Sequence, residues 1–206
     1  MTHASPDLRP TRFLDYEHAS IQSFVRDAIA GAESDVERAK RLFVAVRDGV
    51  RYDPYEMPTG PGDLTASATL ERGRAFCVPK AILLGAALRA AGIPTRLGFA
   101  DVTNHLATQR LLDSLKTDVF AFHGYAIAEI GGRTVKLTPA FDARLCAFFG
   151  VPPLEFDGEN DAMLQPFDGR GRAFLEYLRD RGVYDDFPYD EMLRVWREIY
   201  PHMFAP

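Results

Sequence analysis

The segment VFAFHGYAIAEIGGRTVKLTPAFD has the pattern of two antiparallel strands joined by a tight turn. Strand-forming residues run on both sides of Gly131 and Gly132, and a Gly-Gly pair suits a two-residue type I′ turn, in which both central residues have positive φ. Such a turn pairs Ile130 with Arg133 across the hairpin. The chain is therefore expected to contain an antiparallel sheet, whose register can be counted outward from this turn.

The same register places a histidine opposite possible partners. Counting outward from the turn pairs His123 with Ala140. Because side chains alternate between the two faces of a strand, Thr138 and Asp142 would be the diagonal neighbours of His123 on one face. We therefore predict that the Asp142 carboxylate accepts the ring N–H of His123. A slip of one residue in register would move Asp142 to the other face.

Helical patterns lie on both sides of the hairpin. Apolar residues recur at helical spacing in EHASIQSFVRDAIAG, and a capping-box pair, Ser34 and Glu37, precedes AKRLFVAVRDGV. The segment CVPKAILLGAALRA begins at Cys77 and predicts a helix that Gly92 ends, and TRLGFADV predicts a strand. Two more helices are expected in RAFLEYLRDRG and YDEMLRVWREIY. Helices followed by antiparallel strands and further helices predict an α+β fold.

The length of 206 residues suits one domain with a buried hydrophobic core. We expect N-terminal helices over residues 1–51, a core over 52–142 and a C-terminal helical extension over 143–206. The terminal helices carry apolar side chains that would pack on the core or on a second subunit. These side chains are Phe174, Leu175, Leu178, Leu193, Trp196 and Ile199.

Composition and charge exclude several classes of protein. The net charge of -5 argues against a dedicated nucleic-acid-binding protein, which would carry a basic patch or stripe. The N-terminal segment has no apolar signal-peptide region, and the longest apolar stretch is too short to span a bilayer. Cys77 and Cys146 cannot form a disulfide framework, although a single bridge between them is an alternative. We therefore expect a cytoplasmic protein with reduced thiols and without nucleic-acid or membrane partners.

Cys77 is the candidate nucleophile. A thiol at the start of a helix lies at the positive end of the helix dipole, which favours the thiolate. His123 would take up the thiol proton, and Asp142 would orient the imidazole. The competing interpretation is that Cys77 only packs in the core, as a cysteine before an apolar run commonly does. Cys77, His123 and Asp142 are therefore predicted as nucleophile, base and orienting residue.

Metal sites are alternative interpretations of the same residue types. A zinc site would use Cys77, His105, His123 and Cys146, but no close-spaced ligand pair of the C-x₂₋₄-C kind is present. His105 also competes with His123 as the base, although the sequence offers it no carboxylate partner. The acidic run over residues 155–161 lacks the closing bidentate Glu of an EF-hand. We therefore expect neither a metal nor another cofactor.

The segments CVPKAILLGAALRAAGIPTRL and HGYAIAEIGGRTVKLTPAFD together resemble the transglutaminase-like superfamily, whose members are relatives of papain-type cysteine proteases. The resemblance extends from Tyr52 to Asp142. It implies a papain-like fold in which a catalytic cysteine begins a central helix packed on an antiparallel sheet. By position it implies Cys77 as nucleophile and His123 as base. The family's Asp before Pro is replaced here by Thr138, so Asp142, four residues on, would take its role.

The resemblance implies a thiol-dependent acyl hydrolase or acyltransferase, that is, a cysteine protease, an amidase or a transglutaminase-like enzyme. The substrate would be a peptide or protein amide, either a glutamine side chain or a peptide bond. The backbone N–H of Cys77 would hold the oxyanion, and Tyr52 or Tyr55 either adds a donor or covers the core. The alternative is an inactive binding or interaction module of the same fold, which the Thr138 replacement favours.

Overall fold

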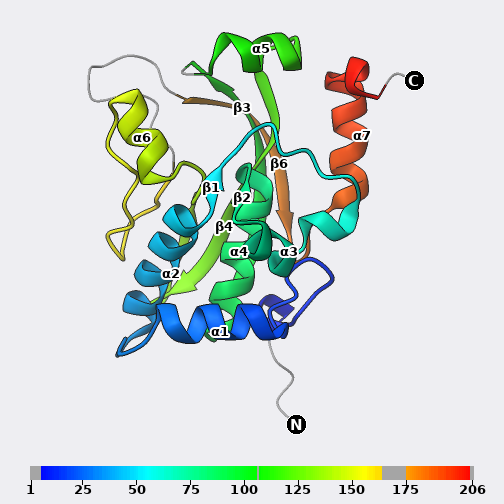
Figure 1. Cartoon of the computed structure of the whole chain (residues 1–206). Helices are drawn as coiled ribbons and strands as arrows, with labels where there is room; N and C mark the ends of the chain where they lie inside the picture. Colours follow the sequence, from blue (N-terminus) through cyan, green and yellow to red (C-terminus); the bar gives the residue numbers. More distant parts are fainter. Residues whose placement is uncertain (1–5, 106, 164–174, 205–206) are drawn as a thin grey trace.

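An antiparallel sheet of four strands, in the order β5–β4–β3–β6, organises the computed structural model of the chain (Figure 1). The structure describes residues 6–105, 107–163 and 175–204. The strands of this sheet are β3 (Thr95–Asn104), β4 (Val119–Ile130), β5 (Arg133–Leu137) and β6 (Leu175–Tyr184). Two short strands, β1 (Arg51–Tyr52) and β2 (Arg74–Ala75), form a separate parallel pair. Together with the helices, the antiparallel sheet confirms the predicted α+β class.

The turn between β4 and β5 is the one that the sequence predicts. Ile130 lies opposite Arg133, and Gly131 and Gly132 have φ values of 59° and 77°. Residues with a side chain rarely adopt this left-handed conformation, so the two glycines permit the tight connection. The predicted hairpin and its register near the turn are confirmed.

The predicted pairing of His123 with Ala140 was wrong, because the ladder between β4 and β5 ends at Leu137. Beyond that residue Thr138 donates its N–H to the carbonyl oxygen of Ala162 at 2.8 Å, and the following proline has no N–H to donate. The last paired residues are Ala126 and Leu137, three positions short of His123 on β4. Register can therefore not be counted from the turn as far as His123.

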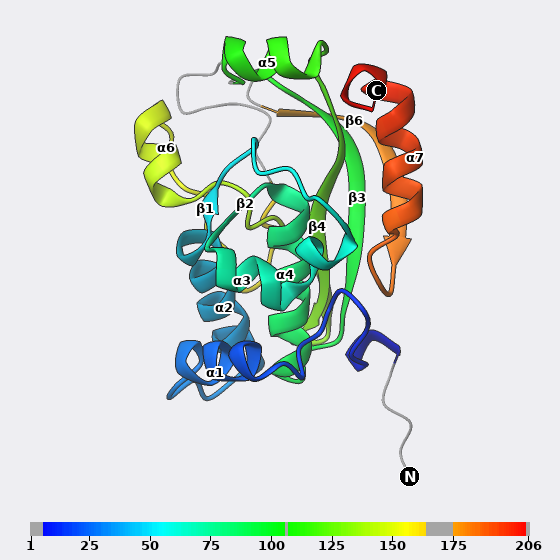
Figure 2. The same ribbon diagram turned by 45° about the vertical axis from the view of Figure 1, so that its right-hand side comes forward.

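Helix α4 (Cys77–Ala90) lies in the middle of the fold, between the sheet and helices α1 to α3 (Figures 1 and 2). Every residue from Val78 to Arg89 is buried. Apart from Lys80 and Arg89 the buried residues are apolar or glycine, which suits a helix with no face that reaches water. Gly92 follows with a φ of 82°, as predicted for the residue that ends this helix. The central helix thus begins at Cys77.

The other helices surround this core. They are α1 (Ala19–Ala28), α2 (Asp35–Gly49), α3 (Ala66–Arg72), α5 (Gln109–Leu115), α6 (Ala143–Phe149) and α7 (Tyr189–Ile199). Short 3₁₀ turns cover Pro6–Leu8, Pro61–Leu64 and Pro201–Met203. At the start of α2 the Ser34 hydroxyl accepts the N–H of Glu37 at 3.2 Å, and the Glu37 carboxylate accepts the N–H of Glu33 at 2.8 Å. The predicted cap of this helix is confirmed.

The C-terminal segment corrects one prediction. Residues 175–182, expected in a helix, belong instead to strand β6 (Leu175–Tyr184), which pairs antiparallel with β3. The segment contains good helix formers, but pairing covers an edge of β3 that would otherwise be open, and this tertiary contact outweighs local propensity. Phe174 lies outside the described residues. The second predicted helix is α7, on which Trp196 is buried.

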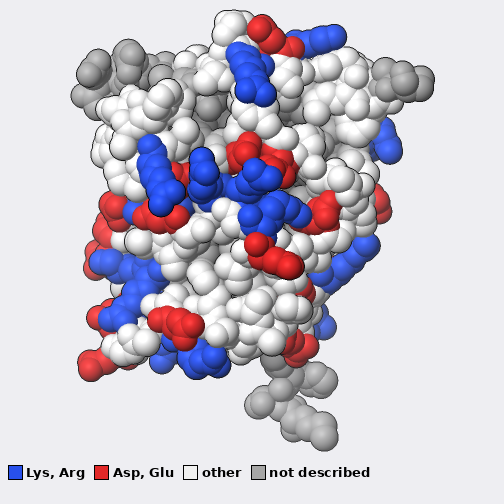
Figure 3. All heavy atoms as spheres, in the orientation of Figure 1, with Lys and Arg blue, Asp and Glu red and all other residues white. Residues whose placement is uncertain are grey.

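No helix in the described part of the chain is long and apolar enough to cross a membrane. On the face shown in Figure 3, Lys and Arg side chains gather across the middle with Asp and Glu beside them. Several of the exposed charges of the described residues are paired, as in the ion pair of 2.6 Å between Arg74 and Glu56. Charges of both signs therefore share this face.

A buried lysine attaches α4 to the end of α2. The Lys80 Nζ donates hydrogen bonds to the carbonyl oxygens of Arg47, at 2.8 Å, and Val50, at 2.5 Å. Carbonyl groups at the end of a helix lack intrahelical partners, so the lysine satisfies groups that would otherwise be unpaired. Burial lowers the pKa of Lys80 to about 7. The lysine thereby fixes the helix that carries Cys77.

We expect Lys80→Met to lower the free energy of unfolding by about 1–3 kcal/mol, because methionine leaves two buried carbonyl groups without donors. Urea denaturation followed by circular dichroism measures the change. Lys40→Met, on the exposed side of α2, is the control and should change stability by less than about 0.5 kcal/mol. Equal stability of the two variants would show that Lys80 does not hold α4 in place.

Candidate functional site

A cavity of about 60 Å³ lies at the N-terminal end of α4, and both Cys77 and His123 line it. Cys77 is the first residue of α4 and is partly buried, whereas His123, on β4, is only 4% exposed. Most of the remaining lining is apolar, and it includes the aromatic rings of Phe120 and Trp196. The structure therefore places the predicted nucleophile and the predicted base on one small cavity.

Gly124, next to His123, brings β4 against the first turn of α4. Its backbone N–H donates a hydrogen bond to the Cys77 thiol. A Cβ atom added to Gly124 would lie 3.2 Å from the Cα of Val78 and 3.2 Å from the Cβ of Ala81, closer than most such contacts. Because any side chain here would push the strand away from the helix, glycine permits the approach. In the sequence, Gly124 is only a small residue after the histidine, and nothing there predicts its contact with α4.

Burial controls the charge state of Cys77. Desolvation raises the pKa of the thiol to about 11, although the backbone N–H groups of Gly124, Val78 and Cys77 itself lower it. The sequence predicted a thiolate at the start of the helix, and this expectation was wrong because burial outweighs the hydrogen bonds and the helix dipole. Cys77 is therefore a neutral thiol at pH 7.

Burial has the opposite effect on the imidazole. It lowers the pKa of His123 to about 4, so that the ring is neutral at pH 7. The Nε2 atom is buried and has no hydrogen-bond partner among the described residues. The ring of Tyr177, on β6, packs against the imidazole with 6.3 Å between the ring centroids. His123 is thus an uncharged base with a free nitrogen, in a cavity that also holds the thiol.

The Asp142 carboxylate binds backbone N–H groups and not the imidazole of His123. One carboxylate oxygen accepts the backbone N–H groups of Arg144 and Leu145, each at 3.0 Å, and so caps the start of α6. The other oxygen accepts the N–H of Tyr52 at 2.7 Å. No hydrogen bond between Asp142 and His123 is found in the described residues. The prediction depended on the hairpin register, which ends before these residues.

Tyr52, unlike Tyr55, reaches the cavity that contains Cys77. Its ring packs edge-on against Phe141 with 4.8 Å between centroids. Burial raises the pKa of Tyr52 well above its usual value, and a negative charge on Cys77, where that thiol is ionised, would raise it further. The Tyr55 hydroxyl instead lies 3.3 Å from the Thr108 hydroxyl, away from the thiol. Of the two predicted candidates for an oxyanion donor, only Tyr52 lines the cavity of Cys77.

The irregular backbone of β4 before His123 is held by a buried ion pair that sequence analysis missed. The Asp101 carboxylate accepts the N–H of Phe122 at 3.1 Å. Arg181, on β6, binds the same carboxylate through Nε, at 2.9 and 3.0 Å, and through Nη2, at 2.5 Å. Both side chains are nearly buried. The two residues are far apart in sequence, and neither has a motif that would have marked it.

Trp196, on α7, and Tyr200, which directly follows that helix, bind the backbone of the same stretch of β4. The Tyr200 hydroxyl accepts the N–H of Ala121 at 2.7 Å and donates to the carbonyl oxygen of Val119 at 2.8 Å. The indole N–H of Trp196 donates to the carbonyl oxygen of Ala121 at 3.3 Å. These side chains satisfy backbone groups that the irregular strand leaves unpaired, and both also line the cavity. The C-terminal helix is therefore part of the site.

The remaining candidate residues lie elsewhere. His105 is exposed, and its Nε2 is 4.0 Å from the Glu176 carboxylate. Cys146 is buried on α6, and both cysteines are free thiols. The described residues contain no group of three or more His, Cys, Asp or Glu side chains that could hold a metal ion. The structure thus does not bring together the four residues of the alternative zinc site.

Comparisons with known proteins place the chain in a family. A model described as the transglutaminase-like superfamily matches residues 22–133, which include Cys77 and His123 but not Asp142. A solved structure of a putative cysteine protease from Cytophaga hutchinsonii has 17% sequence identity and a TM-score of 0.50, over 87% of this chain and 53% of that chain. This chain therefore spans about half the length of that protein. At this identity the likeness bears on the fold alone.

A second solved structure, of a putative protease from Parabacteroides distasonis, has 16% identity and a TM-score of 0.43. The match covers 65% of this chain and 26% of that chain. No curated protein matches the chain.

We expect Arg181→Ala to lower the free energy of unfolding by about 3–5 kcal/mol, because it leaves the buried Asp101 carboxylate without its partner. Chemical denaturation measures this loss. Arg179→Ala, an exposed position on the same strand, is the matched control and should cost less than about 0.5 kcal/mol. Similar losses in the two variants would contradict the role of the ion pair.

Proposed function

Because the chain belongs to the transglutaminase-like superfamily, we propose that it is a thiol-dependent acyl hydrolase or acyltransferase. The observation that supports this proposal best is the cavity shared by Cys77 and His123, with the Gly124 N–H donated to the thiol. The proposed substrates are amides of peptides or proteins, either a peptide bond or a glutamine side chain. The solved structure with a similar fold is described as a putative cysteine protease, which agrees with this class of substrate.

The first half of the reaction starts from two neutral groups. As the Cys77 sulfur attacks the substrate carbonyl carbon, His123 takes up the thiol proton at a ring nitrogen. The C–N bond then breaks, the leaving amine takes the proton from His123, and a thioester joins the acyl group to Cys77. With a pKa of about 4, His123 is unprotonated at pH 7, and it takes up the proton as the sulfur bonds to the carbonyl carbon and the S–H group becomes acidic.

The second half of the reaction releases the acyl group. Water attacks the thioester in a hydrolysis, whereas a second amine attacks it in an acyl transfer. His123 takes a proton from the attacking group and returns it to the Cys77 sulfur as the C–S bond breaks. The backbone N–H of Cys77 and the Tyr52 hydroxyl are the proposed donors to the oxyanion. The raised pKa of Tyr52 keeps its hydroxyl protonated and thus able to donate.

Two observations favour a second candidate, an inactive binding module of the same fold. By its resemblance to the family, the position before Pro139 would hold an Asp, but this chain has Thr138 there. The Thr138 hydroxyl contacts the sulfur of Met163 at 3.4 Å. His123 has no carboxylate bonded to Nε2 in the described residues. A module of this kind would bind peptides without forming an acyl-enzyme, so covalent acylation of Cys77 separates the two candidates.

The test is acylation of Cys77 by p-nitrophenyl acetate, followed by nitrophenolate release and by peptide mapping of the adduct. We expect His123→Ala to reduce the acylation rate by about 10²- to 10⁴-fold, the usual contribution of a general base. The rate should fall at acidic pH only near pH 4, where His123 becomes protonated. His105→Ala, exposed and outside the cavity, is the control and should leave the rate unchanged. An acylation rate that is unchanged in His123→Ala, or the absence of acylation, would favour the binding module.

Asp142 has a positioning role in this proposal, since its carboxylate holds Tyr52 and the start of α6. We expect Asp142→Asn to slow acylation by p-nitrophenyl acetate but to leave the acidic limb of the pH profile near pH 4. An orienting carboxylate raises the pKa of its imidazole, so its removal would move that limb to lower pH. A shift of the limb in Asp142→Asn would therefore restore Asp142 as the partner of His123.

A further inference from the structure

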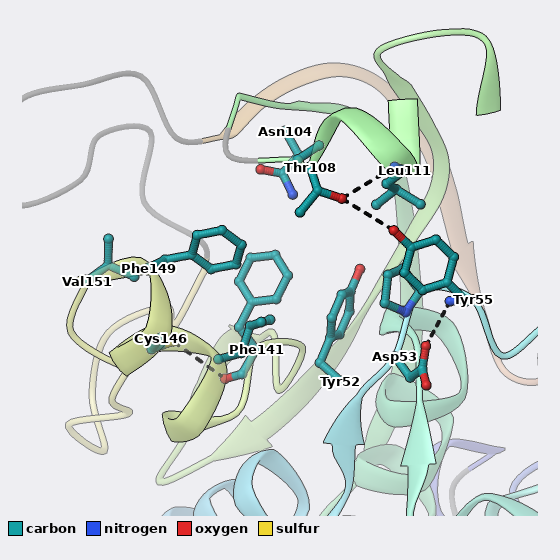
Figure 4. A pocket seen from close by; sticks show the side chains of 13 residues that line it. Tyr52, Asp53, Tyr55, Asn104, Thr108, Leu111, Phe141, Cys146, Phe149 and Val151 are labelled. Carbon is teal, nitrogen blue, oxygen red and sulfur yellow. Dashed lines mark hydrogen bonds between the residues drawn. The ribbon is translucent and has the colours of Figure 1, made fainter. Parts of the chain in front are cut away.

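A second cavity, of about 280 Å³, adjoins the cavity of Cys77 and His123 (Figure 4). Tyr52, Pro54 and Leu111 line both cavities. The second cavity extends from these shared residues toward α6, and neither Cys77 nor His123 lines it. A molecule whose carbonyl group reaches the thiol can therefore place a neighbouring group in the second cavity.

The lining of the second cavity is mainly apolar. Figure 4 shows the rings of Phe149 and Phe141 on the side of α6, and the Phe141 ring packs edge-on against the ring of Tyr52. Leu145 and Val151 add aliphatic surface on the same side. Such a surface favours an uncharged, apolar occupant, because burying a charge there would cost its hydration without a partner.

The polar groups of the cavity lie on the opposite side and bond mostly to one another. The Thr108 hydroxyl is 3.3 Å from the Tyr55 hydroxyl and accepts the N–H of Leu111 at 3.3 Å. The Asp53 carboxylate accepts the N–H of Tyr55 at 3.0 Å. These groups form a polar edge to an apolar interior, as in sites that bind a side chain and leave its backbone near solvent.

The size of the cavity limits its occupant. A cavity of about 150 Å³ holds a benzene molecule, and pockets for whole small molecules begin at about 300 Å³. A volume of about 280 Å³ therefore fits one aromatic or large aliphatic side chain.

We propose that this cavity binds a bulky apolar side chain of the substrate, next to the carbonyl group that Cys77 attacks. The proposal rests on the proposed function, because it assigns the substrate class of the same site. Continuity through Tyr52 and Leu111, the apolar lining and the volume all support it. The substrate is therefore a peptide or acyl compound with an aromatic or large aliphatic group beside the amide that reacts.

The test compares two reagents that alkylate thiols and differ only in their side chain. These are the chloromethyl ketones of N-acetylphenylalanine and N-acetylalanine, and peptide mapping locates the adduct on Cys77. We expect the phenylalanine reagent to react about tenfold faster or more, since its ring would be removed from water in the cavity. Iodoacetamide, which has no such side chain, measures the intrinsic reactivity of the thiol in each variant.

Two variants on α6 separate the cavity from general effects. Leu145 lines the second cavity but not the cavity of Cys77, so Leu145→Trp fills the second cavity and should abolish the preference for the phenylalanine reagent. Ala147→Trp adds the same side chain at an exposed position of the same helix and should keep the preference. Reaction with iodoacetamide should be the same in both. If Leu145→Trp does not fold, Val151→Phe fills the cavity from another position.

Equal rates of the two reagents in the unmodified protein, or a preference that survives in Leu145→Trp, would overturn the proposal. A separate result would show that the proposed function fails: the rate at which iodoacetamide alkylates Cys77 would be the same in His123→Ala as in the unmodified protein. In that case N-acetylphenylalaninamide and N-acetylalaninamide are compared as reversible ligands of Cys77→Ser by saturation-transfer NMR. Binding of the phenylalanine compound alone, lost in Leu145→Trp, would retain the cavity as a side-chain site, and no difference would reject it.

Discussion

The contact between Gly124 and the first turn of α4 is the constraint on which the candidate site depends. It lets β4 approach Val78 more closely than a side chain normally allows, and it brings a backbone N–H to the thiol of Cys77. The same close packing removes water from the thiol and from His123. The positions and the charge states of Cys77 and His123 therefore have one cause. The packing that places both groups on one cavity also keeps both of them neutral.

A neutral pair changes what catalysis requires of the surroundings. A thiolate–imidazolium pair needs its charges stabilised at rest, whereas a neutral pair needs stabilisation only while the proton is on His123. In this structure, hydrogen bonds hold the backbone just before His123. The ion pair of Asp101 and Arg181 binds it on one side, and the Tyr200 hydroxyl binds it on the other. These contacts fix the direction of the histidine without changing its charge.

Local signals in the sequence predicted local structure well, and the structure departs from prediction where distant segments meet. The Gly131-Gly132 turn needs only its own residues, so its register was predictable. Strand β6 was not, because its conformation depends on pairing with β3, about eighty residues away in sequence. Residue type and family resemblance pointed to Cys77 and His123, whereas Asp142 was reached by counting through Pro139, where pairing with Ala162 replaces the ladder.

Asp142 nevertheless connects the two cavities. By accepting the N–H of Tyr52 and capping α6, its carboxylate joins the strand that carries Tyr52 to the helix that carries Leu145 and Phe149. Tyr52 is the wall between the thiol and the apolar cavity, and the other two residues line the far side. The carboxylate accepts three backbone N–H groups, and no hydrogen bond joins it to His123 in the described residues. Its place in the structure thus favours a role in substrate selection over a role in proton transfer.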